Sequence, residues 1–337
     1  MKIAFFEVSK GEQPVFSRML NSLEVSFCED KLSEENVHLA KEAEIICIFI
    51  NSIVNKEIID ALPNLKFIAT RSTGFNHLDC EYAKTKGIKI SNVPAYGSHT
   101  VAEFTFGLIL NLSRNIIKAN NYIRKSPDFN YFSAMEGFDL QGKTLGIIGL
   151  GKIGKNVAKI AKGFAMNIVA YDLYPDLIFA QENNFAYKSL KEVLCQSDIV
   201  TLHVPYNKEN HHLLNKENIS LMKKGVYLIN TARGELIDTE ALIWGLKEGI
   251  IAGAGLDVLE GEQELKEEIE ILSSPSKLTR IEDYRTLLED RVLIDMPNVI
   301  ITPHIAFYAQ EAVAEIFKIT VENIKSFIAN NPKNLVK

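Results

Sequence analysis

Short apolar runs alternate with amphipathic stretches along almost the whole chain. In the N-terminal part, the apolar runs predict strands at residues 2–8, 24–28, 45–50, 66–70 and 88–91. The run from Ile45 to Ile50 is apolar at every position, as expected of a strand covered on both faces. The stretches between the runs predict helices around residues 33–42, 56–62 and 79–86. Alternating strands and helices indicate an α/β fold with parallel sheets.

A second alternation begins near residue 144. Its apolar runs predict further strands near residues 144–148, 167–171, 198–202, 226–230, 252–256 and 299–301. The chain has 337 residues, and a single hydrophobic core rarely grows beyond about 250 to 300 residues. We therefore expect two βα domains, each with its own core.

Residues 99–119 predict one long helix between these two systems. Its apolar residues, among them Phe106, Ile109 and Leu112, cover most of the helix circumference. Such a helix must be buried on nearly every side. It could fill the core of one domain, but we favour a helix that spans the domains or packs against a second subunit.

A glycine fingerprint of the form Gly-x-Gly-x-x-Gly follows an apolar strand and opens an amphipathic helix. Its members are Gly149, Gly151, Lys152, Ile153 and Gly154. The first glycine allows a tight turn, the second lets a pyrophosphate approach the backbone, and the third lets helix and strand close up. The amino end of the helix then offers N–H groups and its positive dipole to the phosphates. The motif predicts a dinucleotide site.

Asp172 ends the next predicted strand, eighteen residues after Gly154. A carboxylate at this place accepts hydrogen bonds from a ribose diol and repels a 2′-phosphate. Residues 173–176 contain no Arg or Lys that could hold such a phosphate. The pattern favours NAD over NADP.

Composition narrows the partners of the protein. Lys and Arg number 37 against 43 Asp and Glu, which gives a net charge of −6 and no basic footprint for nucleic acid. No apolar run approaches the about 20 residues needed to span a bilayer, so no membrane association is expected. The histidines lack metal-ligand spacing, so no metal is expected. Scattered cysteines indicate free thiols in a reducing cytoplasm, and they are Cys28, Cys47, Cys80 and Cys195.

Three polar segments each follow an apolar strand, which is where open α/β sheets bind ligands. They contain Arg233, Glu262 and His304. Taken singly, Arg233 could be a surface cation, Glu262 part of an acidic stretch, and His304 a core histidine. We expect that acidic stretch, residues 262–291, to be a solvated and partly helical surface excursion. Taken together beside a nucleotide site, they form an electrophile, a carboxylate and a general acid or base.

Several motifs in order make the sequence resemble the D-isomer-specific 2-hydroxyacid dehydrogenase family over essentially the whole chain. The motifs are STGFNHLD (72–79), NVPAYG (92–97), GLGKIG (149–154), HVP (203–205), NTARG (230–234), GLDVLEGE (255–262) and TPHIAF (302–307). Within the family, the sequence is most similar to the D-lactate dehydrogenase branch, because of Tyr96, the DVLEGE form and the segment from His304 to Tyr308.

The resemblance implies an α/β fold of two doubly wound parallel-sheet domains, with a Rossmann NAD-binding domain inserted in a flavodoxin-like substrate domain. The expected boundaries are 1–98, completed by 303–337, for the substrate-binding domain and 99–302 for the NAD-binding domain. The family's substrate lies in the cleft between its two domains.

The resemblance also implies roles for individual residues. Arg233 binds the substrate, Glu262 is the carboxylate partner, and His304 is the proton donor. Glu260 lies in the same motif, but the family's acid stands five residues after the aspartate of GLD, which is Glu262. The implied substrate contacts are Thr73, Gly74, Tyr96 and Phe307. The further NAD contacts are Val204, Pro205, Asn210, Thr231, Ala232 and Asp257.

The activity implied is NADH-dependent reduction of a small 2-ketoacid, with pyruvate favoured, to the D-2-hydroxyacid, and the reverse oxidation. A homodimer in the cytoplasm is expected. Other members of the family reduce glyoxylate, hydroxypyruvate or branched 2-ketoacids, and these substrates stay open. A different class is also open, since corepressor-like scaffolds that sense NAD(H) share the fold and the Arg, Glu and His set.

Overall fold

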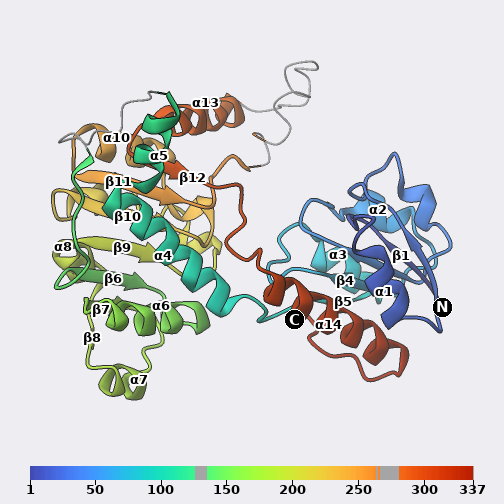
Figure 1. The fold of residues 1–337 in the computed structure, drawn as a ribbon. Helices are drawn as coiled ribbons and strands as arrows, with labels where there is room; N and C mark the ends of the chain where they lie inside the picture. The colour runs from blue at the N-terminus through green and yellow to red at the C-terminus, as the bar shows by residue number, and fades with distance from the viewer. Residues whose placement is uncertain (126–134, 263–264, 266–280, 337) are drawn as a thin grey trace. The chain divides into compact units, whose positions relative to one another are not determined.

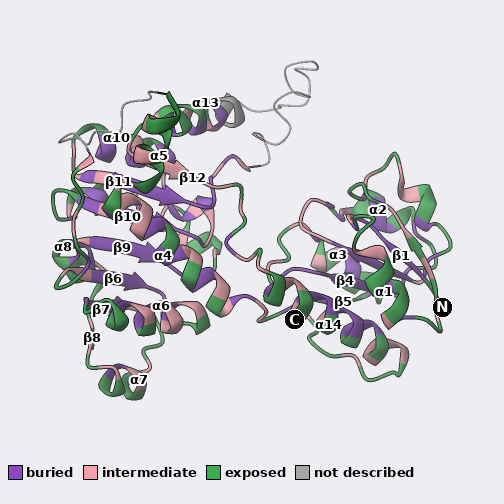
Figure 2. Cartoon of the chain, in the orientation of Figure 1, coloured by how far each residue is buried: buried purple, intermediate pink, exposed green. Residues whose placement is uncertain are grey.

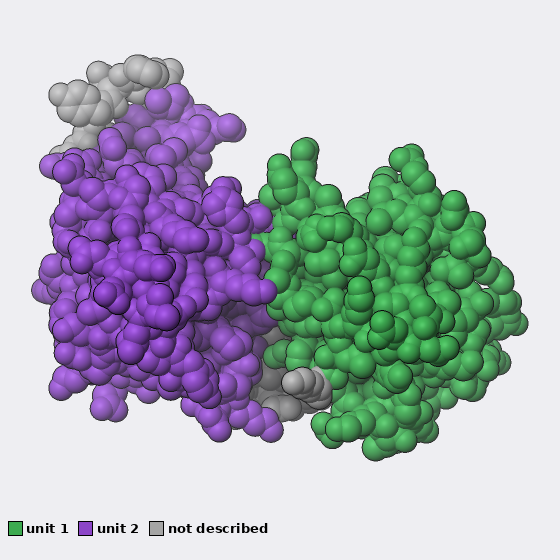
Figure 3. Space-filling model, turned by 90° about the horizontal axis from the view of Figure 1, so that it is seen from below, with its two compact units in different colours: residues 1–97, 308–337 green, residues 98–307 purple. Residues whose placement is uncertain are grey.

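The computed structural model describes residues 1–125, 135–262, 265 and 281–336 (Figure 1). The chain forms two compact units, coloured separately in Figure 3. One unit consists of residues 1–97 and 308–337, and the other of residues 98–307. The chain therefore leaves the first unit after Gly97 and returns to it at Tyr308.

The first unit contains a five-stranded parallel sheet in the order β2-β1-β3-β4-β5. Its strands are β1 (Lys2–Phe5), β2 (Glu24–Phe27), β3 (Ile45–Ile48), β4 (Phe67–Thr70) and β5 (Lys89–Ser91). Its helices are α1 (Gln13–Met19), η1 (Val37–Ala40), α2 (Lys56–Asp60), α3 (Cys80–Thr85) and α14 (Gln310–Ile328). Every strand expected from the apolar runs is present, although each is shorter than predicted.

The helix predicted at 33–42 is wrong, because only the short 3₁₀ helix η1 forms there. The Asn36 side chain accepts a hydrogen bond from the Ser33 amide at 2.8 Å and donates one to the Lys31 carbonyl at 2.8 Å. Such local bonds between side chain and backbone compete with helix formation.

Aromatic contacts fasten the C-terminal helix α14 to the first unit. Phe327 stacks on Phe67 of β4 with ring centroids 4.3 Å apart, and Phe317 lies 4.6 Å from Phe16 of α1. Phe16 in turn lies 4.8 Å from Phe5 of β1. The end of the chain thus completes the core of the N-terminal sheet.

The second unit contains a seven-stranded parallel sheet in the order β12-β11-β10-β9-β6-β7-β8. Its strands are β6 (Thr144–Ile148), β7 (Asn167–Tyr171), β8 (Ala186–Tyr187), β9 (Ile199–Leu202), β10 (Val226–Asn230), β11 (Ile251–Leu256) and β12 (Val299–Ile301). Its helices are α4 (Ser98–Arg114), α5 (Ile116–Lys125), α6 (Lys152–Gly163), α7 (Leu177–Glu182), α8 (Leu190–Gln196), η3 (Lys208–Asn210), α9 (Lys216–Ser220), η4 (Gly234–Leu236), α10 (Thr239–Lys247) and α13 (Ile281–Asp295).

Both faces of this sheet are covered, so its central strands β6, β9, β10 and β11 are almost entirely buried, whereas β7, β8 and β12 are only partly buried (Figure 2). Neighbouring residues of one strand belong to different hydrophobic clusters, as Ile147 and Ile148 do in β6. Successive side chains of a strand point to opposite faces, so the two clusters are the two sides of a doubly wound sheet. Strand order reverses between β9 and β6, and ligands bind at the carboxyl ends of the strands at such a point.

The single helix predicted at 99–119 is wrong, because the chain breaks at Asn115, whose φ is 51°. The first part, α4, packs on β11 through glycines: a Cβ atom on Gly255 would lie 3.0 Å from Leu108, and one on Gly253 would lie 3.3 Å from Leu112. Much of the apolar surface of α4 is therefore covered within its own unit.

The helix α5 has no buried residue, in contrast to α4. Its apolar side chains Ile116, Ile117 and Ile123 are 52%, 41% and 46% exposed. The described chain thus leaves apolar side chains of α5 exposed. The expectation of a helix buried on nearly every side is wrong for α5, and α4 is buried on one side only, with Glu103 and Gly107 exposed.

The acidic stretch 262–291 lies largely outside the described residues, which omit 263–264 and 266–280. Its described end belongs to α13, which buries Leu287 and Asp290 but leaves Leu288 66% exposed, so this part is a helix with one packed and one solvated side. Within the described ranges, no helix is long and apolar enough to cross a membrane.

Candidate active site

The glycine fingerprint forms a tight turn between β6 and α6. Gly149 has a φ of 94°, and a Cβ atom there would overlap the His203 carbonyl. A Cβ atom on Gly154 would overlap the carbonyl oxygen of Gly149. At Gly151, by contrast, nothing lies within 4 Å of the position of a Cβ atom, so this backbone is open to approach. Close contacts therefore require glycine at 149 and 154, whereas Gly151 leaves the backbone accessible.

The amino end of α6 has no side-chain cap, since its N-cap residue is Gly151. The first amides of a helix need acceptors, and here no side chain of the cap residue provides one. A negatively charged group approaching Gly151 would meet these amides and the positive end of the helix dipole. The turn fits a pyrophosphate.

Asp172 stands directly after β7 and ties this turn to the neighbouring strand. One carboxylate oxygen accepts a hydrogen bond from the Leu150 amide at 2.6 Å, and the other accepts one from the Tyr174 amide at 2.8 Å. The side chain thus lies beside the glycine turn, at the end of the neighbouring strand, where a dinucleotide fold places the carboxylate that binds the ribose.

Arg233 follows β10 in a turn that Asn230 closes. The Asn230 carboxamide accepts a hydrogen bond from the Ala232 amide at 3.0 Å and donates one to the Arg233 carbonyl at 2.8 Å. The Arg233 guanidinium donates to the Ala232 carbonyl at 2.7 Å. Asn230 was not among the predicted site residues, although its place in the NTARG motif, at the end of a strand, was a signal for it.

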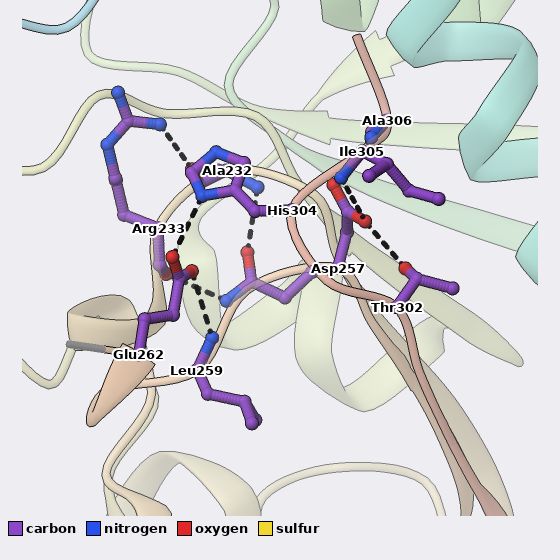
Figure 4. Close-up of polar contacts among 10 residues, drawn as sticks. Ala232, Arg233, Asp257, Leu259, Glu262, Thr302, His304, Ile305 and Ala306 are labelled. Carbon is purple, nitrogen blue, oxygen red and sulfur yellow. Dashed lines mark hydrogen bonds and ion pairs between the residues drawn. The ribbon is translucent and has the colours of Figure 1, made fainter. Parts of the chain in front are cut away.

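His304 stands in a turn after β12 and has a φ of 55°, a conformation that non-glycine residues rarely adopt. The buried carboxylate of Asp257, at the end of β11, holds this turn (Figure 4). It accepts hydrogen bonds from the Ile305 amide at 2.9 Å, the Ala306 amide at 2.8 Å and the Thr302 hydroxyl at 2.5 Å. Burial raises the pKa of Asp257. These contacts serve the His304 turn, which the sequence analysis did not foresee for Asp257.

Glu262 contacts the imidazole of His304. Its Oε2 lies 3.0 Å from His304 Nδ1, and the two side chains are 26% and 25% exposed. Glu262 Oε1 also accepts a hydrogen bond from the Leu259 amide at 3.3 Å. Figure 4 shows the carboxylate between the Leu259 backbone and the imidazole ring. A carboxylate on Nδ1 orients the ring and stabilises its charged form.

Glu260 turns to a different partner. Its carboxylate lies 2.6 Å from His212 Nε2 and accepts a hydrogen bond from the Thr239 hydroxyl at 2.8 Å. Of the two carboxylates in the motif, the structure therefore pairs Glu262, and not Glu260, with His304.

The segment after β9 lies beside the glycine turn, since His203 contacts Gly149 as described. Burial lowers the pKa of His203 to about 3, so its imidazole is neutral. Val204 and Pro205 follow, and the Asn210 side chain donates to the Pro205 carbonyl at 2.8 Å. The Thr231 hydroxyl lies 3.1 Å from that of Thr105 in α4. These predicted NAD contacts stand at the carboxyl ends of β9 and β10.

The predicted substrate contacts are divided between the units. Thr73, Gly74 and Tyr96 belong to the first unit, and Phe307 belongs to the second. The loop after β4 is fixed by the Thr73 hydroxyl, which donates to the Val93 carbonyl at 2.7 Å, and by the Thr73 carbonyl, which accepts from the Asn92 side chain at 2.7 Å.

Comparison with known proteins identifies relatives along the whole chain. The family model of the D-isomer specific 2-hydroxyacid dehydrogenase, NAD binding domain, matches residues 106–306. An aromatic 2-oxoacid reductase of Clostridium sporogenes is 40% identical over 308 residues, which cover 90% of this chain and 88% of the relative. The D-lactate dehydrogenase of Escherichia coli is 34% identical, with 97% and 96% of the two chains covered.

A solved structure is similar as well. The D-lactate dehydrogenase of Aquifex aeolicus, complexed with NAD and lactic acid, has a TM-score of 0.85 and 38% identity, covering 98% of this chain and 96% of its own. The expected α/β fold with a Rossmann NAD-binding domain and the expected cofactor NAD are thereby confirmed.

Replacing Asp172 tests its expected role toward the ribose of NAD. Asp172→Asn keeps an acceptor near the Leu150 amide but removes the charge that repels a 2′-phosphate. We expect it to raise turnover with NADPH relative to NADH by about 10-fold, the equivalent of about 1.4 kcal/mol. Steady-state rates with both cofactors measure this ratio. Asp172→Ala, which also loses the bond to the glycine turn, should in addition weaken NADH binding. Equal use of NADPH and NADH by the wild type would contradict the assignment.

Proposed function

Since the chain belongs to the D-isomer-specific 2-hydroxyacid dehydrogenase family, an NAD-dependent class of enzymes, we propose that it reduces pyruvate to D-lactate with NADH and catalyses the reverse oxidation. The observation that carries the proposal is the 3.0 Å contact between Glu262 Oε2 and His304 Nδ1. These two residues follow β11 and β12, and Arg233 follows the neighbouring strand β10. This set can bind a carboxylate and deliver a proton to a carbonyl oxygen.

We assign NAD to the unit of residues 98–307 and the substrate loop to the unit of residues 1–97 and 308–337. The turn of Gly149, Gly151 and Gly154 would hold the pyrophosphate, and Asp172 would hold the adenosine ribose. When bound, NADH supplies the hydride. The remaining predicted contacts from Val204 to Ala232 follow the neighbouring strands β9 and β10, whereas the buried carboxylate of Asp257 holds the His304 turn instead.

His304 performs the proton transfer in this proposal. Protonated His304 donates from Nε2 to the carbonyl oxygen as the carbonyl carbon is reduced, because its Nδ1 is engaged by Glu262. The negative charge of Glu262, 3.0 Å from Nδ1, favours the imidazolium form that donates the proton. Arg233 pairs with the substrate carboxylate through its planar guanidinium and polarises the carbonyl. Asn230 holds the turn from which Arg233 projects.

The size of the substrate that the enzyme accepts depends on the predicted substrate-contact residues. Backbone amides of Thr73 and Gly74 would receive the carboxylate, and Tyr96 would lie near it. Phe307 would narrow the space for the side chain, which favours pyruvate over larger 2-ketoacids. A second candidate is an aromatic 2-oxoacid, because the relative from Clostridium sporogenes, named for such substrates, is 40% identical over 90% of this chain. Glyoxylate, hydroxypyruvate and branched 2-ketoacids are the further candidate substrates.

Turnover of a substrate panel, together with one variant, tests the proposal. We expect NADH oxidation with pyruvate at a higher kcat/KM than with glyoxylate, 2-ketoisocaproate, hydroxypyruvate or phenylpyruvate. His304→Ala should lower kcat by roughly 10²- to 10⁴-fold, the usual contribution of a positioned acid or base, while the NADH Kd stays unchanged. If NADH is oxidised with none of these substrates, the proposed function is contradicted. A preference for phenylpyruvate would favour the second candidate.

Replacing Glu262 tests the ion pair by the pH dependence of the reaction. Glu262→Gln keeps a hydrogen bond to His304 but removes the charge that stabilises the imidazolium. Reduction needs imidazolium, so the falling limb of its pH profile should move to lower pH. Oxidation needs neutral imidazole, so its rising limb should move the same way. A reduction profile that stays in place, or moves to higher pH, would show that Glu262 is not the partner.

We propose that the protein works as a homodimer in the cytoplasm, with α4 and α5 at the interface. The exposed isoleucines of α5 support the dimer, and the four free cysteines support a reducing compartment. Light scattering at micromolar concentration should give twice the chain mass of 37.8 kDa. Ile116→Lys with Ile123→Lys should shift the protein toward monomer, whereas Leu39→Lys, at another exposed leucine, should not. A wild-type monomer at all concentrations would contradict the interface.

A further inference from the structure

The side chain of Glu260 is held on both of its carboxylate oxygens. Oε1 lies 2.6 Å from His212 Nε2, and Oε2 accepts the hydrogen bond from the Thr239 hydroxyl at 2.8 Å. Glu260 is only 18% exposed and Thr239 is buried at the start of α10. A carboxylate withdrawn this far from water requires such partners, because an unpaired charge in this place is costly.

His212 is fixed by its own backbone. Its φ of 51° turns the chain, and its amide donates to the Glu235 carbonyl at 2.9 Å. Two residues later, Leu214 pairs with Ile237 in a short parallel bridge. The imidazole therefore projects from a segment that is fastened to residues 235–237, which follow Arg233 directly.

The backbone of the Arg233 turn packs closely against the segment that contains Glu260 and Glu262. A Cβ atom on Gly234 would overlap the Leu259 carbonyl and the Glu260 amide. On the other side of Glu260, the Gly261 amide donates to the buried Asp290 at 3.0 Å. A movement of Glu260 would therefore displace both Glu262 and the turn of Arg233.

We infer that the ion pair between His212 and Glu260 positions the catalytic groups. It holds residues 257–262 against the Arg233 turn, so that Glu262 meets His304 at 3.0 Å. His212 is thus a positioning residue that acts through Glu260, and it does not touch the reacting atoms. The inference rests on the proposed function, since it assigns a support to that same site.

A metal ion is the competing interpretation of this cluster. Donor atoms of His211, His212 and Glu260 lie within 4.8 Å of one another. In a tetrahedral zinc site, however, two ligand atoms stand about 3.3 Å apart, as the metal–ligand distances require. The 2.6 Å separation between His212 and Glu260 is that of a direct charge-assisted hydrogen bond, which favours the ion pair.

Two variants of His212 and one matched control test the inference. His212→Ala should lower kcat for reduction by roughly 10- to 100-fold, because small displacements of catalytic groups cost this much. The NADH Kd should stay within about twofold, since the glycine turn is untouched. His212→Gln, whose amide can donate to Glu260, should restore most of the kcat. His211→Ala removes the neighbouring imidazole, which stacks on His212, and should keep the wild-type rate.

The double variant separates positioning from a merely structural role. If the pair acts as a unit, His212→Ala combined with Glu260→Ala should cost less than the product of the two single effects. Thermal unfolding checks that each variant is folded. A wild-type kcat in folded His212→Ala, or independent effects of the two changes, overturns the inference. A metal site would also overturn it. In that case zinc chloride would raise the melting temperature of the wild type but not of His212→Ala, and EDTA would lower kcat.

His304→Ala serves as the reference for the proposed function. A collapse of kcat in His304→Ala, with full activity in His212→Ala, overturns the positioning inference and leaves the proposed function intact. Full activity in both variants overturns the proposed function.

Discussion

A buried carboxylate at the end of β11 supports the turn on which the proposed acid stands. Asp257 is 1% exposed, and its carboxylate accepts hydrogen bonds from two backbone amides and one hydroxyl of residues 302–306. The amide of His304 donates in turn to the Asp257 carbonyl at 2.9 Å. A buried charge is stable only with such partners, and the left-handed conformation of His304 persists only where neighbouring bonds enforce it. The contact between His304 and Glu262 therefore depends on Asp257.

Four carboxylates around the second sheet have different roles, and their surroundings indicate which are structural and which is catalytic. Asp257 is sealed in the interior, and Glu260 is closed off by His212 and Thr239. Asp172 divides its oxygens between two backbone amides beside the glycine turn. Glu262, in contrast, is 26% exposed and lies against an imidazole that is exposed to the same degree. Glu260 also contacts an imidazole, but only Glu262 meets His304, the histidine that the family motif implies as the proton donor, which is why we place the proton transfer there.

Close backbone approaches at glycines set the spacing of the whole site. Gly154 lets α6 close on the Gly149 carbonyl, Gly255 lets α4 lie on β11, and Gly234 lets the Arg233 turn touch the segment of Glu260. A side chain at any of these positions would separate two elements that the site needs together. The glycines outside the fingerprint thus contribute as much to the geometry as those within it.

The positions of the strands along the chain and the nucleotide turn could be predicted from the sequence, because both rest on local signals. Apolar runs mark the strands of the two sheets, and the glycine spacing with Asp172 marks the cofactor turn. Arg233, Glu262 and His304 could be singled out because each follows a strand and stands in a family motif. The short helix at 37–40 was mispredicted, since turn bonds of Asn36 outweighed helix propensity, and so was the unbroken helix at 99–119.

The tertiary structure alone decided which groups meet. Asp257 reaches the His304 turn and Glu260 reaches His212, and both contacts join residues about fifty positions apart. Periodicity and motif spacing report only which side of its own element a residue faces. Contacts between loops depend instead on the register of parallel strands and on how closely their ends approach, and both arise only when the sheet is assembled.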